Sequence, residues 1–283
     1  MREISLSGFD INIKKTKKLT KYLKYLITKI LQKRNRILAV KTEKKEIQEL
    51  MTRLYPVITD KPLIRLGPKA DGGYLLPNDF EEVDALFSAG IGETSEFERD
   101  IANFGIEVFL ADKSVEGPAC YHEKFKFTNK YIGASLNENF LALDDWVSSV
   151  RPVHTKDLIL KMDIEGYEYE TIISLSKNLL KRFRIIVVEF HNLHGIWNKS
   201  YFYFVNCAFR KILSTHTCVH IHPNNKAILS EREGLVIPSL LEISFLRNDR
   251  IINYEYQLSF PHELDYDNTS KQSIQLPNCW FRH

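Results

Sequence analysis

The sequence predicts an α/β protein whose core is a mostly parallel β-sheet. From residue 83 onward, short apolar segments alternate with helical stretches, which is the pattern of successive β-α-β units. The segment 158–162 (LILKM) is apolar at four of five positions, as expected for a central strand covered on both faces. Acidic residues crowd the positions directly after it, at the end of a strand where α/β sheets bind ligands. Such charges are costly to place unless a ligand or partner offsets the cost, so we expect a site there.

The remaining elements follow in chain order. A helix is predicted over 44–54, and two short apolar runs then flank Asp71-Gly72-Gly73 as a hairpin or tight turn. The predicted strands are 85–89, 107–111, 126–132, 158–162 and 185–190, and predicted helices begin near 94 and span 139–150 and 169–180. The segments 210–221 and 240–246 are expected to form an antiparallel pair at the sheet edge.

Composition narrows the class of protein. The 283 residues are 44% hydrophobic and 27% charged, which is ordinary for a globular chain. No apolar run reaches the roughly 18 residues of a membrane span, and no signal-peptide core is recognisable. The four cysteines are scattered without a C-x-x-C pair. They are therefore expected to be reduced thiols of a cytoplasmic protein rather than disulfides or zinc ligands.

The net charge of +3 is unevenly distributed. Residues 1–45 have a net charge of +11, which leaves −8 for the remainder. Apolar residues recur at helical spacing between the lysines: Leu19, Tyr22, Leu23, Leu26, Ile27, Ile30 and Leu31. We therefore predict a basic amphipathic helical arm over 1–55, which either lies on an anionic membrane or packs on the body or on a second subunit of a homodimer. A solvated, partly disordered tail is the alternative interpretation. Nucleic acid is not expected as a partner, because the body is acidic and the arm has no series of stacking aromatics.

A glycine loop follows the first predicted strand of the sheet. Gly90 and Gly92 lie where strand turns into helix, and Asp112 ends the next strand about 20 residues on, where a carboxylate accepts hydrogen bonds from ribose hydroxyls. A plain turn would also explain the glycines. Glu93 is the first of three glutamates in this loop, which has no lysine. Such a loop suits a cofactor without phosphate, for example S-adenosylmethionine with its positive sulfonium.

Together these motifs resemble the FkbM-like branch of the class I S-adenosylmethionine-dependent methyltransferases over about residues 63–247. The motifs are 71–74 (DGGY), 88–92 (SAGIG), 95–98 (SEFE), 111–112 (AD), 143–146 (LDDW), 160–166 (LKMDIEG), 187–191 (VVEFH), 220–225 (HIHPNN) and 241–245 (LEISF). The segment 160–166 is the most specific. The resemblance implies a Rossmann-like sheet of seven strands with the last one antiparallel, which follows the helical arm predicted above. It also implies a cofactor lying across the glycine loop, with residues 71–74 capping it.

The chain departs from the wider methyltransferase pattern at one position. That pattern has an acidic residue before the glycines, whereas this chain has Ser88. The methionine end of the cofactor is then left to Glu93, Asp71 or Asp163. The residues expected to contact the cofactor are Asp71, Gly72, Tyr74, Gly90, Gly92, Glu93, Asp112 and Asp163.

A second group of polar residues ends the neighbouring strands. Glu189 and His191 are two apart and share a face with each other, and His222 lies in a later strand-end segment. Asp163, Glu189 and His222 could bind a divalent cation that orients sugar hydroxyls and lowers the pKa of one of them. Alternatively, Asp163 or His191 acts as a metal-free general base. A third interpretation is that these groups only hydrogen-bond to loops and to one another.

These observations predict an O-methyltransferase that acts on a sugar hydroxyl, either of a sugar nucleotide or of a glycan precursor. The link to surface polysaccharide or capsule is implied by the family resemblance alone. A nicotinamide-dinucleotide oxidoreductase is one alternative, although Ser95 stands where the third glycine of that fingerprint belongs. A non-catalytic Rossmann-like scaffold is the other. We expect a cytoplasmic or membrane-peripheral protein with an arm (1–55), a methyltransferase domain (56–247) and a packed tail (248–283).

Overall fold

The computed structural model describes residues 20–23, 25–29, 33, 39–152 and 156–283. Contacts divide the chain into two units, Met1–Lys41 and Thr42–His283. In the first unit, residues 20–23 and 25–29 are helical, as predicted, while Leu19, Ile30 and Leu31 lie outside the described residues. No helix in the described part of the chain is long and apolar enough to cross a bilayer.

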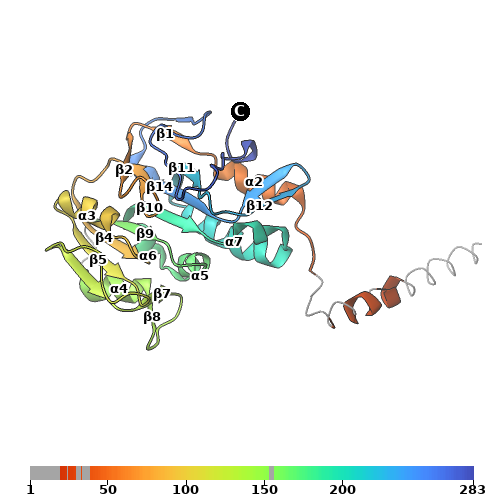
Figure 1. The fold of residues 1–283 in the computed structure, drawn as a ribbon, viewed down its shortest axis with the longest axis horizontal. Helices are drawn as coiled ribbons and strands as arrows, with labels where there is room; N and C mark the ends of the chain where they lie inside the picture. The colour runs from red at the N-terminus through yellow and green to blue at the C-terminus, as the bar shows by residue number, and fades with distance from the viewer. Residues whose placement is uncertain (1–19, 24, 30–32, 34–38, 153–155) are drawn as a thin grey trace, which may run out of the picture. The chain divides into compact units, whose positions relative to one another are not determined.

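A seven-stranded sheet forms the centre of the second unit. Its strands are β4 (Val83–Ala89), β5 (Glu107–Ala111), β6 (Phe125–Thr128), β9 (Asp157–Met162), β10 (Phe183–Phe190), β11 (His216–Pro223) and β14 (Leu241–Arg247). The order across the sheet is β11-β14-β10-β9-β4-β5-β6 (Figure 1). Strand β14 runs antiparallel to both of its neighbours, and the other six strands are parallel to one another. The predicted Rossmann-like sheet with a reversed last strand is confirmed.

Strand β14 lies inside the sheet, and β11 forms its edge. The predicted antiparallel pair is therefore correct, but only one of its members is an edge strand. After β10 the chain forms a helix and then returns to the sheet as its edge strand, β11. It then reverses and enters the sheet between β11 and β10 as β14. A strand that returns in this way must run antiparallel, which explains the reversed direction of β14.

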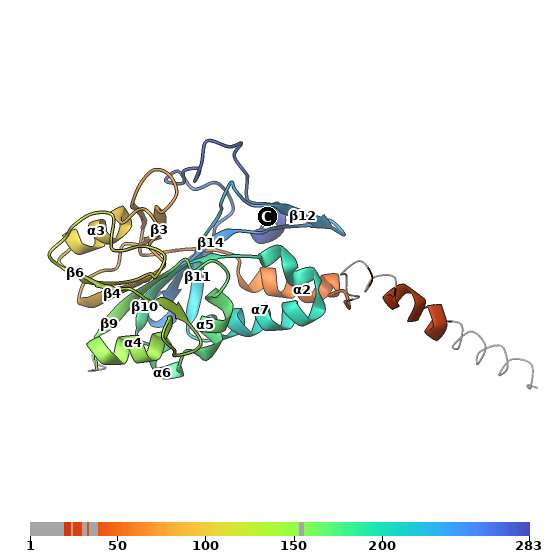
Figure 2. The ribbon, with the colours of Figure 1, turned by 60° about the horizontal axis from the view of Figure 1, so that its bottom comes forward.

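Helices cover the sheet on both faces. They are α2 (Lys44–Arg53), α3 (Glu96–Asn103), α4 (Leu143–Val150), α5 (Glu168–Ser174), α6 (Lys177–Leu180) and α7 (Lys199–Ile212). Apolar residues of α2, α4, α5, α6 and α7 share one core with one face of the sheet. The other face packs on α3 and on the hairpin of β2 (Leu63–Leu66) and β3 (Tyr74–Pro77), so the two cores lie on opposite sides (Figure 2). The DGGY motif ends the loop of this hairpin, as predicted.

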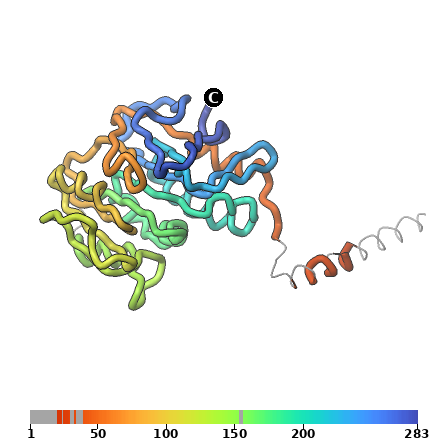
Figure 3. Tube along the Cα trace, in the orientation of Figure 1, coloured from red at the N-terminus to blue at the C-terminus, as the bar shows by residue number. Residues whose placement is uncertain are grey.

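Several small elements complete the unit. They are β1 (Val57–Thr59), β7 (Tyr131–Gly133), β8 (Phe140–Ala142), β12 (Leu229–Arg232), β13 (Leu235–Pro238), β15 (Tyr254–Tyr256), η1 (Leu193–Trp197), η2 (Asn248–Arg250) and η3 (Asn278–Trp280). Strands β1 and β15 pair antiparallel, so an early and a late segment of this unit run side by side (Figure 3). The indole of Trp280 is fully buried and its Nε1 donates to the carbonyl oxygen of Val236 at 3.0 Å, which fixes the tail on the body.

Some predicted boundaries are wrong. The predicted strand 126–132 is two strands, because the chain turns between β6 and β7, and the predicted helix 139–150 begins only after β8. The first residues of 210–221 belong to α7. Helix α2 lies within the predicted arm (1–55), but it buries Ile47, Leu50 and Met51 in the core of the second unit. Its apolar stripe, rather than the local excess of lysine, decides where it packs.

Candidate active site

The carboxyl ends of three neighbouring strands meet at the glycine loop. Gly90 N donates to the carbonyl oxygen of Ala111 at 2.9 Å, and Asp163 N donates to that of Ala89 at 2.9 Å. Gly90 has a φ of +75°, and a Cβ added there would lie 2.7 Å from the carbonyl carbon of Asp163. Only glycine fits at this position, because any side chain would push the Asp163 backbone away.

A cavity of about 660 Å³ opens at this edge of the sheet. All eight residues predicted to contact the cofactor line it: Asp71, Gly72, Tyr74, Gly90, Gly92, Glu93, Asp112 and Asp163. They come from the β2–β3 hairpin and from the ends of β4, β5 and β9, which are far apart in sequence. The structure therefore brings the separate motifs together around one space.

Asp112 is anchored through both of its oxygens. Oδ2 accepts hydrogen bonds from Ile91 N at 3.0 Å and Gly92 N at 3.1 Å, and Oδ1 accepts from Ser114 N and Oγ, each at 2.7 Å. Burial by itself would raise the pKa of Asp112, but these hydrogen bonds outweigh it and lower the pKa. Asp112 is thus an ionised carboxylate at the cavity wall that also fixes the conformation of the glycine loop.

One part of the cavity wall is aromatic and apolar. Tyr131, Ile132, Phe140 and Tyr167 contribute to it, and the ring centroid of Phe140 lies 5.3 Å from those of Tyr131 and Tyr167. Such a surface suits a flat heteroaromatic ring. The sequence did not identify these residues, because β7 and β8 have no motif of their own and their closeness to the glycine loop is purely tertiary.

Tyr74, at the start of β3, orients the carboxylate of Asp163. Its hydroxyl donates to Asp163 Oδ2 at 3.1 Å. Burial and the nearby negative charge of Asp163 raise the pKa of the Tyr74 phenol well above its usual value. The phenol therefore remains a hydrogen-bond donor, and the last residue of the DGGY motif orients the carboxylate that ends β9.

Glu168 organises the loop after Asp163; it is one of the acidic residues that the sequence places after the strand 158–162, but the sequence assigned it no role. This fully buried residue accepts hydrogen bonds at Oε1 from Ile164 N at 3.1 Å and Gly166 N at 3.0 Å. The same oxygen lies 3.0 Å from His191 Nδ1. An acidic residue at the first position of a helix, directly after a glycine turn, was the available signal.

His191 lies beside the cavity and does not line it. Its Nε2 is 3.9 Å from Asp163 Oδ1 and 3.4 Å from Glu165 Oε2. Burial by itself would lower the pKa of His191, but the hydrogen bond with Glu168 and the surrounding carboxylates raise it to about 9. Of the two predicted catalytic residues, Asp163 lines the cavity, and His191 contacts Asp163 without lining the cavity.

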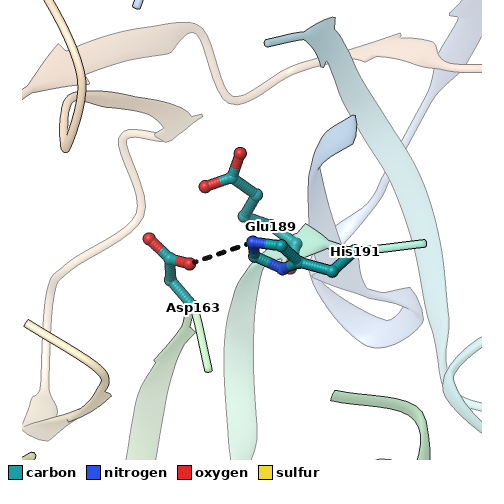
Figure 4. A group of neighbouring side chains, drawn as sticks. All are labelled: Asp163, Glu189 and His191. Atoms are coloured by element: carbon teal, nitrogen blue, oxygen red, sulfur yellow. Dashed lines mark hydrogen bonds and ion pairs between the residues drawn. The ribbon is translucent and has the colours of Figure 1, made fainter. Parts of the chain in front are cut away.

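Asp163, Glu189 and His191 converge at the ends of β9 and β10 (Figure 4). Each offers one ligand atom, and these atoms lie within 4.8 Å of one another. Glu189 accepts a hydrogen bond from Asn224 Nδ2 at 2.7 Å, and burial raises its pKa well above the usual value.

The predicted metal ligand His222 is not part of this group. Glu242 of β14 is paired with Glu189 on one side and with His222 on the other, so β14 separates them. His222 Nδ1 instead lies 3.5 Å from Asp265 Oδ1 in the tail. The inserted strand could not be foreseen from the spacing of the histidines, and His191 takes the place of His222 in the cluster.

Residues 138–215 match the family described as the methyltransferase FkbM domain. No curated protein matches the chain. The N-methyltransferase NodS from Bradyrhizobium japonicum WM9 is 11% identical, with a TM-score of 0.34 over 58% of this chain and 86% of that one. The 1,6-didemethyltoxoflavin-N1-methyltransferase from Burkholderia thailandensis, with bound 1,6-didemethyltoxoflavin and S-adenosylhomocysteine, is 13% identical, with a TM-score of 0.30 over 59% of this chain and 72% of that one. At these TM-scores the two structures support no inference about this chain.

The sheet with its reversed strand β14 and the glycine loop at its ligand-binding edge form the Rossmann-like fold that the sequence predicts. The matching segment 138–215 runs from β8 through α7 and includes Asp163 and His191, so the predicted resemblance is confirmed there. Over this segment the chain is similar to the methyltransferase FkbM domain.

Proposed function

We propose that the protein transfers the methyl group of S-adenosylmethionine to a hydroxyl of a sugar, either in a sugar nucleotide or in a glycan precursor of a surface polysaccharide. The observation that supports this best is the single cavity in which the glycine loop, Asp112 and Asp163 meet. Asp112 would accept hydrogen bonds from the ribose hydroxyls, and the rings of Tyr131 and Phe140 would contact the adenine.

Asp163 is the proposed general base. As the acceptor oxygen forms its bond to the methyl carbon, the carbon–sulfur bond breaks and the hydroxyl proton passes to Asp163. The protein would gain most of the acceleration by aligning oxygen, carbon and sulfur. Tyr74 and His191 both contact the carboxylate and would hold it toward the cavity. His191 is therefore proposed as a positioning residue rather than as the base.

The cavity rim favours an acceptor rich in hydroxyls. Asp71, Glu93 and Glu165 line the cavity together with Asp163. Carboxylates accept hydrogen bonds from hydroxyls and repel phosphate. This supports methylation of an uncharged sugar unit, and in our proposal any diphosphate of a sugar nucleotide would lie away from these carboxylates.

A metal-assisted variant of the reaction has a specific observation in its favour. Glu168 contacts Nδ1 of His191, so Nε2 is the ring nitrogen that faces Asp163. In metal sites, the ring nitrogen of a histidine that does not bind the metal usually contacts a carboxylate in the same way. Asp163, Glu189 and His191 would then hold a divalent cation. Such an ion would bind the acceptor hydroxyl and lower its pKa.

The basic arm is proposed to determine where the enzyme works. Its net charge of +11 over residues 1–45 suits either an anionic membrane surface or an acidic surface of a second copy. Flotation with vesicles of anionic lipid and sedimentation of the full chain distinguish the two partners. Removal of residues 1–41 should abolish whichever contact is found and leave cofactor binding unchanged.

Calorimetric titration with S-adenosylhomocysteine and, separately, with NADH tests the cofactor assignment. We expect binding of the first ligand alone. Asp112→Asn should weaken it by about 10- to 100-fold, because a charge-assisted hydrogen bond is worth about 1.5–3 kcal/mol. Asp145→Asn, at an exposed position of α4, is the matched control and should bind like the native protein. Unchanged affinity in Asp112→Asn would refute the placement of the ribose.

Turnover with radiolabelled S-adenosylmethionine tests the acceptor and the metal. Transfer of label to neutral glycosides supports a sugar hydroxyl, and transfer to amine acceptors alone would overturn the proposal. Loss of activity in a chelator, restored by Mg²⁺ or Mn²⁺, would establish the metal-assisted variant. Full activity in the chelator would leave Asp163 as a metal-free base.

A further inference from the structure

The missing acidic residue of the glycine loop is replaced in space by a residue from the following helix. Ser88 occupies the position where the wider pattern has a carboxylate, and its Oγ donates to Glu98 Oε1 at 2.6 Å. Glu98 lies in the first turn of α3, is 2% exposed and lines the cavity. The carboxylate therefore reaches the cavity ten residues later in the sequence than expected.

A buried lysine lies next to this carboxylate on the same side of the sheet. Lys161 of β9 is the direct neighbour of Ser88 in the strand register and is 4% exposed. Its ammonium donates to the carbonyl oxygen of Gly90 and lies 5.5 Å from the centre of the Tyr74 ring. Like Glu98, it lines the cavity, so one buried positive and one buried negative group face the same space.

These two charges are held apart by neutral partners. Glu98 is bonded to a hydroxyl and Lys161 to a carbonyl oxygen, and within the described residues neither has an ion pair shorter than 4.0 Å. Burial raises the pKa of Glu98 above its usual value, and the positive charge of Lys161 and the hydrogen bond from Ser88 offset only part of this increase. Keeping both charges out of water is costly unless complementary charges arrive with a ligand.

We propose that Glu98 and Lys161 bind the zwitterionic α-amino-acid end of the ligand. The carboxylate of Glu98 would receive the α-ammonium, and the ammonium of Lys161 would receive the α-carboxylate. This inference rests on the proposed function, because S-adenosylmethionine ends in such a group. It also explains how the chain binds that end with a serine before its glycines. Glu93, Asp71 and Asp163 would then line the acceptor side of the cavity, with Asp71 also paired to Lys226 and Asp163 bonded to Tyr74.

A pair of ligands separates this role from a merely structural one. S-adenosylhomocysteine carries the amino-acid end, and 5′-methylthioadenosine has the same adenosine and sulfur without it. Calorimetry on the full chain should show that the native protein binds S-adenosylhomocysteine at least tenfold more tightly. In Glu98→Gln and in Lys161→Met this preference should fall at least fivefold, with the affinity for 5′-methylthioadenosine unchanged.

Glu96→Gln is the matched control, since it removes the same charge from the same helix at an exposed side chain. It should leave both affinities unchanged. Equal loss of both ligands in Glu98→Gln would assign Glu98 a structural role and overturn the inference. Equal affinity of the native protein for both ligands would also overturn it while leaving the cofactor assignment intact, and this comparison needs no variant to fold. If the native protein binds neither ligand, the cofactor assignment fails as well.

Discussion

Replacement of Gly90 by alanine tests how the glycine loop is built. Gly90 has a φ of +75°, where an L-residue is strained by about 1–2 kcal/mol. In addition, the new Cβ would lie 2.7 Å from the carbonyl carbon of Asp163, so this backbone must move. The movement would break the 2.9 Å hydrogen bond from Asp163 N to Ala89, which costs a further ~1–3 kcal/mol. We expect Gly90→Ala to lose about 2–5 kcal/mol of unfolding free energy.

The matched control is Gly92→Ala, two residues later in the same loop. Gly92 has a φ of +54°, but a Cβ there would meet no atom within 4 Å. It should therefore lose only the backbone term of about 1–2 kcal/mol. Urea unfolding followed by circular dichroism at pH 7 measures both variants. Equal destabilisation of the two would refute the claim that contact with Asp163, rather than backbone strain, demands glycine at Gly90.

Three further predictions concern residues around the site and the core. Glu168→Gln should lower the pKa of His191 from about 9, because a neutral amide no longer stabilises the imidazolium, and NMR titration of the imidazole measures this; an unchanged pKa would contradict it. Burial lowers the pKa of His216 to about 4 although its Nε2 contacts the Phe183 carbonyl, so the folded state binds fewer protons than the unfolded state between pH 4 and 6.5. Stability should therefore fall by roughly 2 kcal/mol from pH 7 to pH 5, and His216→Gln should lose that part of the pH dependence in urea unfolding. Trp280→Ala should lower the free energy of unfolding by about 3–5 kcal/mol, because the indole is fully buried. A melting temperature within about 2 °C of the native value would show that the tail is not part of the cooperative core.

The sequence predicted most of the sheet because each of these strands is a short apolar segment that can be recognised from its own residues. The segment 158–162 is almost uniformly apolar, and the structure places it at the centre of the sheet with its residues buried. Errors occurred where local pattern does not decide, such as the turn between β6 and β7. They also occurred at α2, where the lysines suggested part of the basic arm although the apolar stripe of the helix packs into the core.

By itself, the sequence determined the fold class, the family resemblance and a set of residues that all line one cavity. Strand-ending motifs are informative in this way because parallel strands bring their carboxyl ends to one edge whatever their separation in the chain. Only the tertiary structure decided which polar groups touch. It placed β14 between Glu189 and His222. It also brought Glu168 into contact with His191 Nδ1, and Glu98 into a hydrogen bond with Ser88. Such contacts depend on strand order and on side-chain direction across separate elements, and neither is written in the spacing of residues along one segment.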